Sequence, residues 1–327
     1  MLGRKQANIL VIKTDGLAAF VAAEPAFDAI RKAHSNAKIS LLTIPELQRI
    51  ARASPFFDQV AAMPNLRDPE ARKELVKQLK AAKFEAVYDL AADDAGKKLQ
   101  AAMGVFRPKW HAAAPASRKI GKKKSKLDAA ALTPMMSNTG LDVDERLPDF
   151  SWALDARKDS ANMKPSWYGI TAPFGLLLPG VDPNKRWPSS CYAGFATIMA
   201  RSGFMPVLAG PKELHHFGDE IAHEAPQLVD LTGKTDHLQL AALAQEAAFF
   251  VTDDAEEMHL AVSVGCEGVL ITDAKSGMAA PHGRHVVVLT AQGNELGSVE
   301  PVLAWRTLSN MGLILIDDDA PISAAAR

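Results

Sequence analysis

A lysine and an arginine stand side by side in a segment whose residue types could bind phosphate. Lys185 and Arg186 lie in residues 178–188, LPGVDPNKRWP, between an apolar run and a helical pattern that begins near Ser189. A compact lysine ammonium and a planar arginine guanidinium together suit a diphosphate. The same spacing also fits a solvated basic turn in which Trp187 packs into a domain. Both interpretations remain open on spacing alone.

Four acidic residues gather at a second position where an anion could bind. Residues 251–260, VTDDAEEMHL, read as the end of a buried strand, a turn and the start of a helix. Such turns receive anions because unpaired backbone N–H groups and the helix dipole point to them. The turn carries Asp253, Asp254, Glu256 and Glu257, and each close contact of Glu256 or Glu257 with a diphosphate would cost about 1 kcal/mol or more. The turn thus has the position of an anion site and a charge that opposes one.

Two other chemistries are not supported by the spacing. Residues 230–235, DLTGKT, contain Gly-Lys-Thr, but a P-loop would need a glycine at position 228, which is Leu228. We expect a tight loop between two elements there. The nine histidines show no spacing typical of metal ligands, so we predict no metal site.

Short apolar runs alternate with helical patterns along most of the chain, which predicts parallel βαβ units and a doubly wound α/β fold. The predicted strands are Ile9–Lys13, Ile39–Thr43, Ala86–Leu90, Gly175–Leu178, Met205–Ala209, Ala248–Thr252, Gly268–Thr272 and His285–Leu289. The predicted helices include Leu17–His34, Glu70–Ala82, Tyr192–Ser202 and Leu238–Glu246.

The alternation breaks near residues 140–172, where prolines and a glycine interrupt it. At 327 residues the chain is long enough for two domains. We therefore predict two Rossmann-like domains facing across a cleft, residues 1–165 and 166–316, with a loose tail at 317–327. A helix over 299–309 could pack back on the N-terminal domain.

The composition is that of a globular protein with a net charge of −1, which gives no reason to expect nucleic-acid binding. Two cysteines are too few for a disulfide framework and fit a reducing compartment. The N-terminus leads directly into a short strand-like run, and no apolar window approaches the length of a membrane span. We therefore expect a cytoplasmic protein, and peripheral contact with the inner face of a membrane stays open.

The motifs, in this order, resemble the ADP-heptose:lipopolysaccharide heptosyltransferases of glycosyltransferase family 9. The C-terminal half carries Pro179-Gly180, KRWP at 185–188, GPKE at 210–213, LTGKT at 231–235, and Asp254 followed by MHLA at 258–261. The N-terminal half agrees more faintly, over residues 9–13, 25–31, 37–42 and 88–90. The resemblance implies a GT-B architecture without an obligatory metal or cofactor. The C-terminal domain would hold an ADP-linked nucleotide sugar as the donor substrate.

The resemblance also implies donor-binding roles for five residues. Lys185 matches a lysine that binds donor phosphate, and Glu213 matches an acidic position near the nucleoside. Asp254, Met258 and His259 match the aspartate, methionine and histidine of the family signature Asp-Thr/Ser-Gly-Pro-Met-His-Leu, which lines the donor pocket. For His259, a helix histidine bonded to a neighbouring backbone group is the alternative.

Three motifs depart from the family pattern. Where the first loop of the family ends in Leu-Gly-Asp, with the presumed catalytic base, this chain has Leu17-Ala18-Ala19. Asp15 is the remaining candidate base on that loop, and a turn or helix-capping acid is the alternative. Thr/Ser-Gly-Pro is replaced by residues 255–257, AEE, and Phe-Gly-Pro-Thr by residues 271–275, ITDAK, in which Lys275 could offset the added acid.

A basic run in the N-terminal half is the candidate for recognising an anionic acceptor or an anionic membrane surface. With Lys13, the candidate acceptor-binding residues are Arg118, Lys119, Lys122, Lys123 and Lys124. A solvated loop is the alternative for this run. Two functions remain: transfer of a sugar, with heptose as one candidate, from a nucleotide sugar to an anionic glycolipid or lipopolysaccharide core; or a catalytically degenerate relative that acts in binding or assembly.

Overall fold

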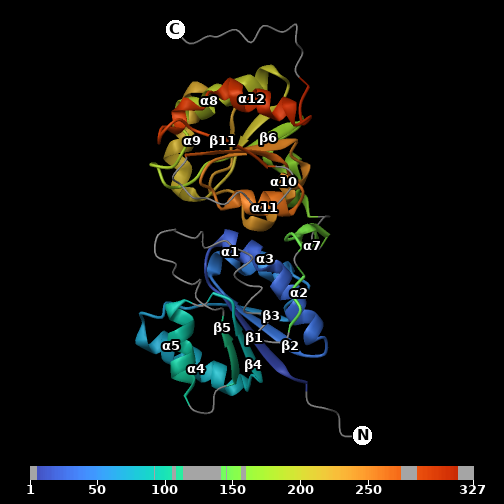
Figure 1. Cartoon of the computed structure of the whole chain (residues 1–327), viewed down its shortest axis with the longest axis vertical. Coiled ribbons are helices and arrows are strands. Elements are labelled where there is room, and N and C mark those ends of the chain that lie inside the picture. Colours follow the sequence, from blue (N-terminus) through green and yellow to red (C-terminus); the bar gives the residue numbers. More distant parts are fainter. Residues whose placement is uncertain are drawn as a thin grey trace. The chain divides into compact units, whose positions relative to one another are not determined.

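The chain divides into two α/β units, Met1–Lys158 with Asp236–Leu238 as unit 1, and Asp159–Thr235 with Gln239–Arg327 as unit 2. The computed structural model describes residues 6–91, 93–104, 108–112, 141–144, 146–155, 160–273 and 286–315. Each unit holds one sheet in which every strand pair is parallel (Figure 1). The predicted fold class of two parallel-sheet α/β domains is confirmed.

Unit 1 has a five-stranded sheet in the order β3-β2-β1-β4-β5. Its strands are β1 (Asn8–Lys13), β2 (Lys38–Thr43), β3 (Gln59–Ala62), β4 (Ala86–Asp89) and β5 (Lys109–Ala112). Its helices are α1 (Leu17–Ala22), α2 (Glu24–Ala33), α3 (Gln48–Ala53), α4 (Pro69–Ala82), α5 (Asp94–Met103) and α7 (Ser151–Asp155). The strand order reverses between β1 and β4, so this pair forms the topological switch point of the sheet.

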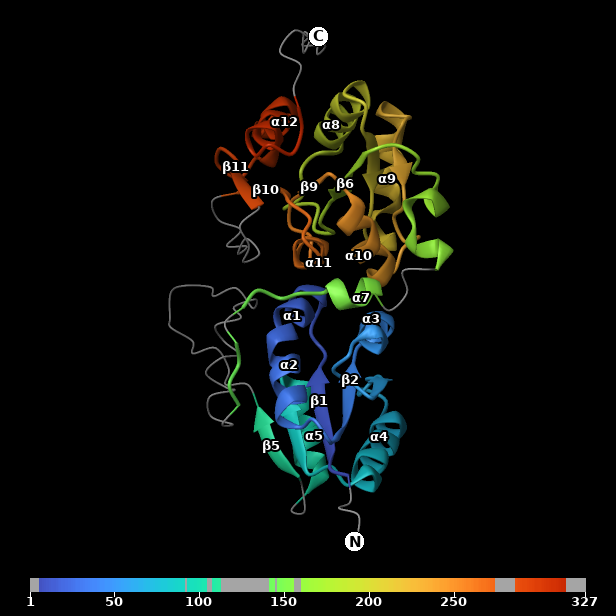
Figure 2. The same ribbon diagram turned by 90° about the vertical axis from the view of Figure 1, so that its right-hand side faces the viewer.

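Helices cover both faces of this sheet, in agreement with the continuous burial of β1 and β4. On one face, Leu75 and Leu79 of α4 and Leu99 of α5 pack with Leu10 and Val87 of the strands. Helices α1 and α2 and the segment before α7 meet through aromatic rings: the ring centroid of Phe20 is 5.1 Å from that of Phe27 and 6.1 Å from that of Phe150. Figure 2 shows β1 between α2 and α4.

Unit 2 has a six-stranded sheet in the order β11-β10-β9-β6-β7-β8, and Figure 2 shows the first four of these strands in succession. Its strands are β6 (Phe174–Leu178), β7 (Met205–Leu208), β8 (Val229–Asp230), β9 (Phe249–Thr252), β10 (Gly268–Thr272) and β11 (Val286–Thr290). Its helices are α8 (Ser189–Arg201), α9 (His215–Glu224), α10 (His237–Glu246), α11 (Glu257–Ser263) and α12 (Pro301–Asn310). The switch point of this sheet lies between β6 and β9.

An aromatic core lies between the sheet of unit 2 and the helices α8 and α12, which lie side by side in Figure 1. The rings of Phe195 and Trp305 are 5.8 Å apart, and Trp305 is 5.9 Å from Phe249 of β9. The predicted terminal helix is thus observed as α12, and it packs against α8 and β10 of its own unit. Of the helices in the described part of the chain, none has the length and apolarity needed to cross a lipid bilayer.

The predicted helix over residues 17–34 is wrong as a single element, because it is interrupted at Ala23. α1 ends at Ala22, and α2 starts with Glu24 and has Pro25 in its first turn. Proline has no N–H group to continue the hydrogen bonds of a preceding helix, but it fits the first turn of a new one. Three strands were also not predicted, β3, β5 and β8, which are only two to four residues long.

Candidate functional site

The candidate donor site lies at the switch point of unit 2. Residues 179–188 follow β6, and residues 253–256 follow β9, the neighbouring parallel strand. Both segments therefore leave the sheet at the same edge and on either side of the point where the strand order reverses. Open α/β sheets bind ligands at this place. The segment from Gly180 to Trp187, which carries Lys185, is called the donor loop below.

Asp253 holds both ends of the donor loop. Its Oδ1 accepts a hydrogen bond from the backbone N–H of Gly180 at 2.6 Å, and its Oδ2 accepts one from the N–H of Trp187 at 2.8 Å. The hydroxyl of Tyr192 on α8 donates to the same Oδ2 at 3.0 Å. Asp253 is 0% exposed, and this burial raises its pKa to about 6 against the opposing effect of these three donors and of the backbone N–H of Asp254.

Of the four acids in this turn, Asp253 is therefore the one whose carboxylate is enclosed within unit 2. Its carboxylate is buried and bonded to backbone N–H groups, because the chain leaves β9 with this side chain directed into unit 2. The next residue differs: the side chain of Asp254 is 20% exposed and pairs with a lysine. Glu256 is exposed at the N-cap of α11, and Glu257 is the first residue of that helix.

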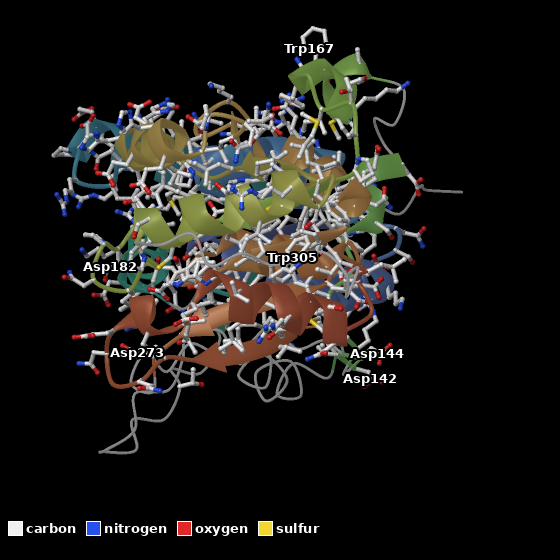
Figure 3. All side chains as sticks on the ribbon, turned by 90° about the horizontal axis from the view of Figure 1, so that it is seen from above. Asp142, Asp144, Trp167, Asp182, Asp273 and Trp305 are labelled. Atoms are coloured by element: carbon white, nitrogen blue, oxygen red, sulfur yellow. The ribbon has the colours of Figure 1, made fainter. Side chains whose placement is uncertain are left out.

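Lys185 and Asp254, which the sequence assigned to the donor site, lie together. The Nζ of Lys185 is 3.2 Å from Oδ2 of Asp254 and 4.0 Å from Oδ2 of Asp182. The pKa of Lys185 is raised, first by the hydrogen bond and charge of Asp254, with smaller effects of Asp182 and Asp273. Figure 3 shows Asp182 and Asp273 at the same edge of unit 2. The lysine side chain stays 45% exposed within this acidic group.

Arg186 makes its contacts within unit 2, and its part in binding a diphosphate beside Lys185 stays untested. Its guanidinium lies 3.8 Å from the ring centroid of Phe217, and its Nη1 donates to the carbonyl of Gly180 at 3.3 Å. The neighbouring Trp187 is 0% exposed and donates from its indole N–H to the carbonyl of Val299 at 2.9 Å. The alternative of a packed Trp187 is thus what the structure has, and Lys185 keeps its ammonium at the surface beside it.

The other predicted donor residues lie on loops and helices that follow the neighbouring strands. Glu213 is exposed in a 3-10 helix, Lys212–Leu214, after β7. The DLTGKT string forms a loop after β8, in which Thr232 contacts Nδ1 of His215 at 2.9 Å. Met258 is 0% and His259 is 9% exposed on α11. Their contact with a nucleotide stays a prediction.

The candidate acceptor side is the switch point of unit 1, where Lys13 ends β1 and Asp15 follows it. The Nζ of Lys13 donates to Oδ2 of Asp15 at 3.0 Å and to the carbonyl of Leu90 at 3.3 Å. The Lys13 side chain is 4% exposed, and burial lowers its pKa in opposition to the charges of Asp15, Asp89 and Asp93. Lys13 thus lies against Asp15, away from the surface position that the predicted acceptor contact would need.

Asp15 keeps 36% of its side chain exposed beside this buried ammonium. The N-cap of α1 is Gly16, and no side chain of the described residues caps that helix end, so Asp15 is not the capping acid of the alternative interpretation. Ala19, at the position of the family's presumed base, is 9% exposed on α1 and offers only a methyl group. Arg118, Lys119, Lys122, Lys123, Lys124 and Lys275 lie outside the described residues.

Thr14 and Asp93 also belong to the switch point of unit 1, and the sequence analysis did not single them out. The hydroxyl of Thr14 donates to Oδ2 of Asp93 at 3.1 Å, while Oδ1 of Asp93 accepts from the N–H of Gly96 and caps α5. An aspartate three residues before a glycine in a helical pattern was the available signal. Over the described residues, no group of three or more His, Cys, Asp or Glu side chains is placed to hold a metal ion.

Comparison with known proteins gives the family. The sequence model of glycosyltransferase family 9 (heptosyltransferase) matches residues 72–272, more than half of the chain, and the chain belongs to this family. Lipooligosaccharide heptosyltransferase 2 of Haemophilus influenzae is 32% identical over 95 residues, which are 27% of this chain and 28% of that protein. Lipopolysaccharide heptosyltransferase 2 of Salmonella typhimurium is 30% identical over 95 residues, 27% of either chain. The chain thus matches less than a third of the length of these relatives.

Solved structures of the family have the same fold. A glycosyl transferase of family 9 from Veillonella parvula superposes with a TM-score of 0.76 at 18% identity, over 93% of this chain and 97% of that one. The E. coli ADP-heptose lps heptosyltransferase II gives 0.72 at 17% identity, over 93% and 98%. The E. coli heptosyltransferase WaaC with ADP gives 0.73 at 16%, over 93% and 99%. The GT-B-like architecture of two parallel-sheet domains is confirmed by these likenesses.

Proposed function

We propose that this protein transfers a sugar from a nucleotide-sugar donor to an anionic glycolipid, such as a lipopolysaccharide core. The donor binds at the switch point of unit 2 and carries ADP, with heptose as the first candidate sugar. The observation that carries this proposal is the exposed Lys185 ammonium at that switch point, beside the Asp254 of the family signature. A partly exposed cation next to a turn that follows a parallel strand is suited to a diphosphate.

The relatives support ADP as the nucleotide. The E. coli heptosyltransferase WaaC was solved with ADP and with ADP-2-deoxy-2-fluoro heptose, and its fold is that of this chain. Glu213, exposed after β7, is the acid that would accept hydrogen bonds from the ribose hydroxyls. Met258 and His259 follow Asp254 on α11 and would form the wall of the donor pocket.

On the acceptor side, Asp15 acts as the general base that takes the proton of the attacking hydroxyl. Asp15 is a partly exposed carboxylate on the first loop, and the buried ammonium of Lys13 donates a hydrogen bond to it. A general base works only within hydrogen-bond reach of the hydroxyl, and the partial exposure of the Asp15 side chain supports its access to an acceptor. Lys13 orients Asp15 in this scheme, and the basic run with Arg118, Lys119 and Lys122 attracts the anionic acceptor.

A second candidate function is binding or assembly without transfer. Two observations favour it: Ala19 stands at the position of the family's base, and Lys185 is already paired with Asp254 in an acidic group. The match to the family also begins at residue 72, so the loop with Asp15 and Ala19 lies outside it. In this case the chain would bind a nucleotide or its conjugate weakly and would not turn it over.

Titration of the purified protein with ADP, UDP and GDP by calorimetry tests the proposal. We expect ADP to bind, with UDP and GDP as the controls for the base. Absence of binding by all three at millimolar concentration would overturn a nucleotide-sugar function. ADP binding without release of ADP from ADP-heptose, in the presence of a lipopolysaccharide-core glycolipid, would favour the binding protein over the transferase.

A further inference from the structure

One buried carboxylate accepts hydrogen bonds from both ends of the donor loop. The two bonds come from N–H groups seven residues apart, Gly180 at 2.6 Å to Oδ1 and Trp187 at 2.8 Å to Oδ2 of Asp253. Lys185 stands between them, two residues before Trp187. A chain segment closed at both ends on one rigid group has far fewer conformations than one closed on two separate groups. The placement of the Lys185 backbone therefore depends on Asp253.

Asp253 itself is fixed. It is 0% exposed, directly follows β9 and receives a third bond from the Tyr192 hydroxyl at 3.0 Å. The loop also lies close to the chain at this point: a Cβ on Gly180 would stand 2.7 Å from the carbonyl oxygen of Asp254 and 2.9 Å from Oδ1 of Asp253. Such separations are shorter than a carbon–oxygen contact allows. Gly180 and Asp253 thus form one close contact, called the Gly180–Asp253 contact below, which needs both the glycine and the carboxylate.

We propose that Asp253 is a positioning residue of the donor site, which holds the donor loop so that the Lys185 ammonium stands at the switch point of unit 2. This inference takes its ligand, a nucleoside diphosphate, from the proposed function. It adds to the donor site a residue, Asp253, that touches neither the ligand nor the reacting atoms. The chemistry requires a carboxylate. Two N–H groups at opposite ends of a loop need two acceptor oxygens, and an amide side chain supplies one.

A purely structural role for Asp253 makes a different prediction. Trp187 is already held by full burial and by its indole bond to Val299, so the packing of unit 2 has its own anchor at this end of the loop. If Asp253 positions the loop, replacing one of its carboxylate oxygens should loosen the loop backbone without displacing Trp187. If Asp253 has only a structural role, the same substitution should lower the global stability and leave the loop amides as protected from hydrogen exchange as the amides around them.

Hydrogen exchange on the full chain separates these two cases without any nucleotide. In Asp253→Asn we expect amides of residues 180–187 to exchange at least about tenfold faster than in the wild type, with α8 and α12 unchanged. Leu308→Ala is the stability control, because Leu308 is 0% exposed on α12 and its truncation weakens unit 2 away from the loop. Unchanged protection of residues 180–187 in Asp253→Asn, or an equal rise in Leu308→Ala, would overturn the proposal.

A double-mutant cycle on ADP affinity tests whether Asp253 acts through Lys185. We expect Asp253→Asn to weaken ADP binding about fivefold in the wild-type background and less than about twofold in the Lys185→Ala background, as for coupled residues. Equal effects in both backgrounds would show that Asp253 does not act through the lysine. If ADP does not bind the wild type, the proposed function fails, and the exchange experiment still decides whether Asp253 holds the loop.

Gly180→Ala is a second substitution that disturbs the Gly180–Asp253 contact, for use if Asp253→Asn does not fold. The added methyl group forces the loop away from Asp254 while the carboxylate of Asp253 is kept. We expect the same faster exchange of residues 181–187 and the same loss of ADP affinity, again dependent on Lys185. Wild-type protection of these amides from exchange, together with wild-type affinity for ADP, would contradict the proposed role of the Gly180–Asp253 contact.

Discussion

Lys185 Nζ lies 3.2 Å from Asp254 Oδ2, and this ion pair joins the loops that follow the two strands of the unit 2 switch point. Both residues were expected at the donor site from their place in the family motifs. Their contact has a consequence for ligand binding, since a diphosphate at Lys185 must share the ammonium with Asp254 or displace it. The affinity for the donor is therefore a balance between these two anions.

Removal of the lysine charge should weaken nucleotide binding. We expect Lys185→Ala to raise the Kd for ADP about tenfold, as for the loss of one charge-assisted hydrogen bond to phosphate. Calorimetry measures this directly. Arg201→Ala is the control, because Arg201 is exposed at the end of α8 and its loss changes the net charge equally. A similar loss in both variants would mean that Lys185 acts through the overall charge alone.

Removal of the competing carboxylate should have the opposite effect. We expect Asp254→Asn to tighten ADP binding by about threefold to tenfold at low salt, with a smaller gain at high salt, because the pair is partly exposed and screened. Affinities measured at two ionic strengths test both parts. Weaker binding in Asp254→Asn would show instead that this carboxylate accepts hydrogen bonds from the donor.

Asp15 should matter for turnover and not for nucleotide binding. If the protein transfers sugar, Asp15→Asn should lower the rate about 100-fold or more, the usual contribution of a general base, with the Kd for ADP unchanged. Release of ADP from the donor measures the rate. The matched control is Asp142→Asn, an exposed aspartate of the same unit that is labelled in Figure 3. Full activity of Asp15→Asn would exclude Asp15 as the base.

The buried Asp253 should make stability depend on pH. Its pKa is raised from 3.8 to about 6 in the folded chain, so the folded state binds a proton more tightly than the unfolded state does. The contribution of this group to stability is present at low pH and lost as pH rises through 6. Between about pH 7 and about pH 4 the wild type should gain about 2 kcal/mol relative to Asp253→Asn.

Thermal or urea unfolding of both proteins at several pH values measures that difference. Groups shared by the two proteins cancel, because only residue 253 differs between them. A difference that stays constant over this pH range would show that the hydrogen bonds to Asp253 fully offset the burial of the carboxylate.

The sequence predicted the four central strands of the unit 2 sheet well because these strands are almost continuously buried. β6, β7, β9 and β10 differ from the predicted runs by at most one residue at either end. β3, with the sequence QVAA, and β5, with KWHA, were missed because a short strand at the side of a sheet has too few apolar residues to show a pattern.

The candidate site was predictable only in part. The place of Lys185 and Asp254 followed from motifs within each loop, whereas the inward direction of Asp253 depends on Gly180 and Trp187, which are 73 and 66 residues away in the sequence. The contact of the Arg186 guanidinium with Phe217 was not predictable for the same reason, because the ring belongs to α9, which follows the next strand, β7. No local sequence pattern predicts these partners. The pairing of β6 with β9 brings Asp253 to the donor loop, and the pairing of β6 with β7 brings the helix that carries Phe217 near Arg186.

The closure of the donor loop on Asp253 also orders events during synthesis. β6 and the donor loop leave the ribosome well before β9, and β7 and β8 with their helices are made in between. Until β9 takes its place beside β6, the N–H groups of Gly180 and Trp187 have no Asp253 to bind. We therefore expect a nascent chain that stops before residue 253 to contain Lys185 without the geometry that makes it a donor-site lysine, so the site forms only after β9 has joined the sheet of unit 2.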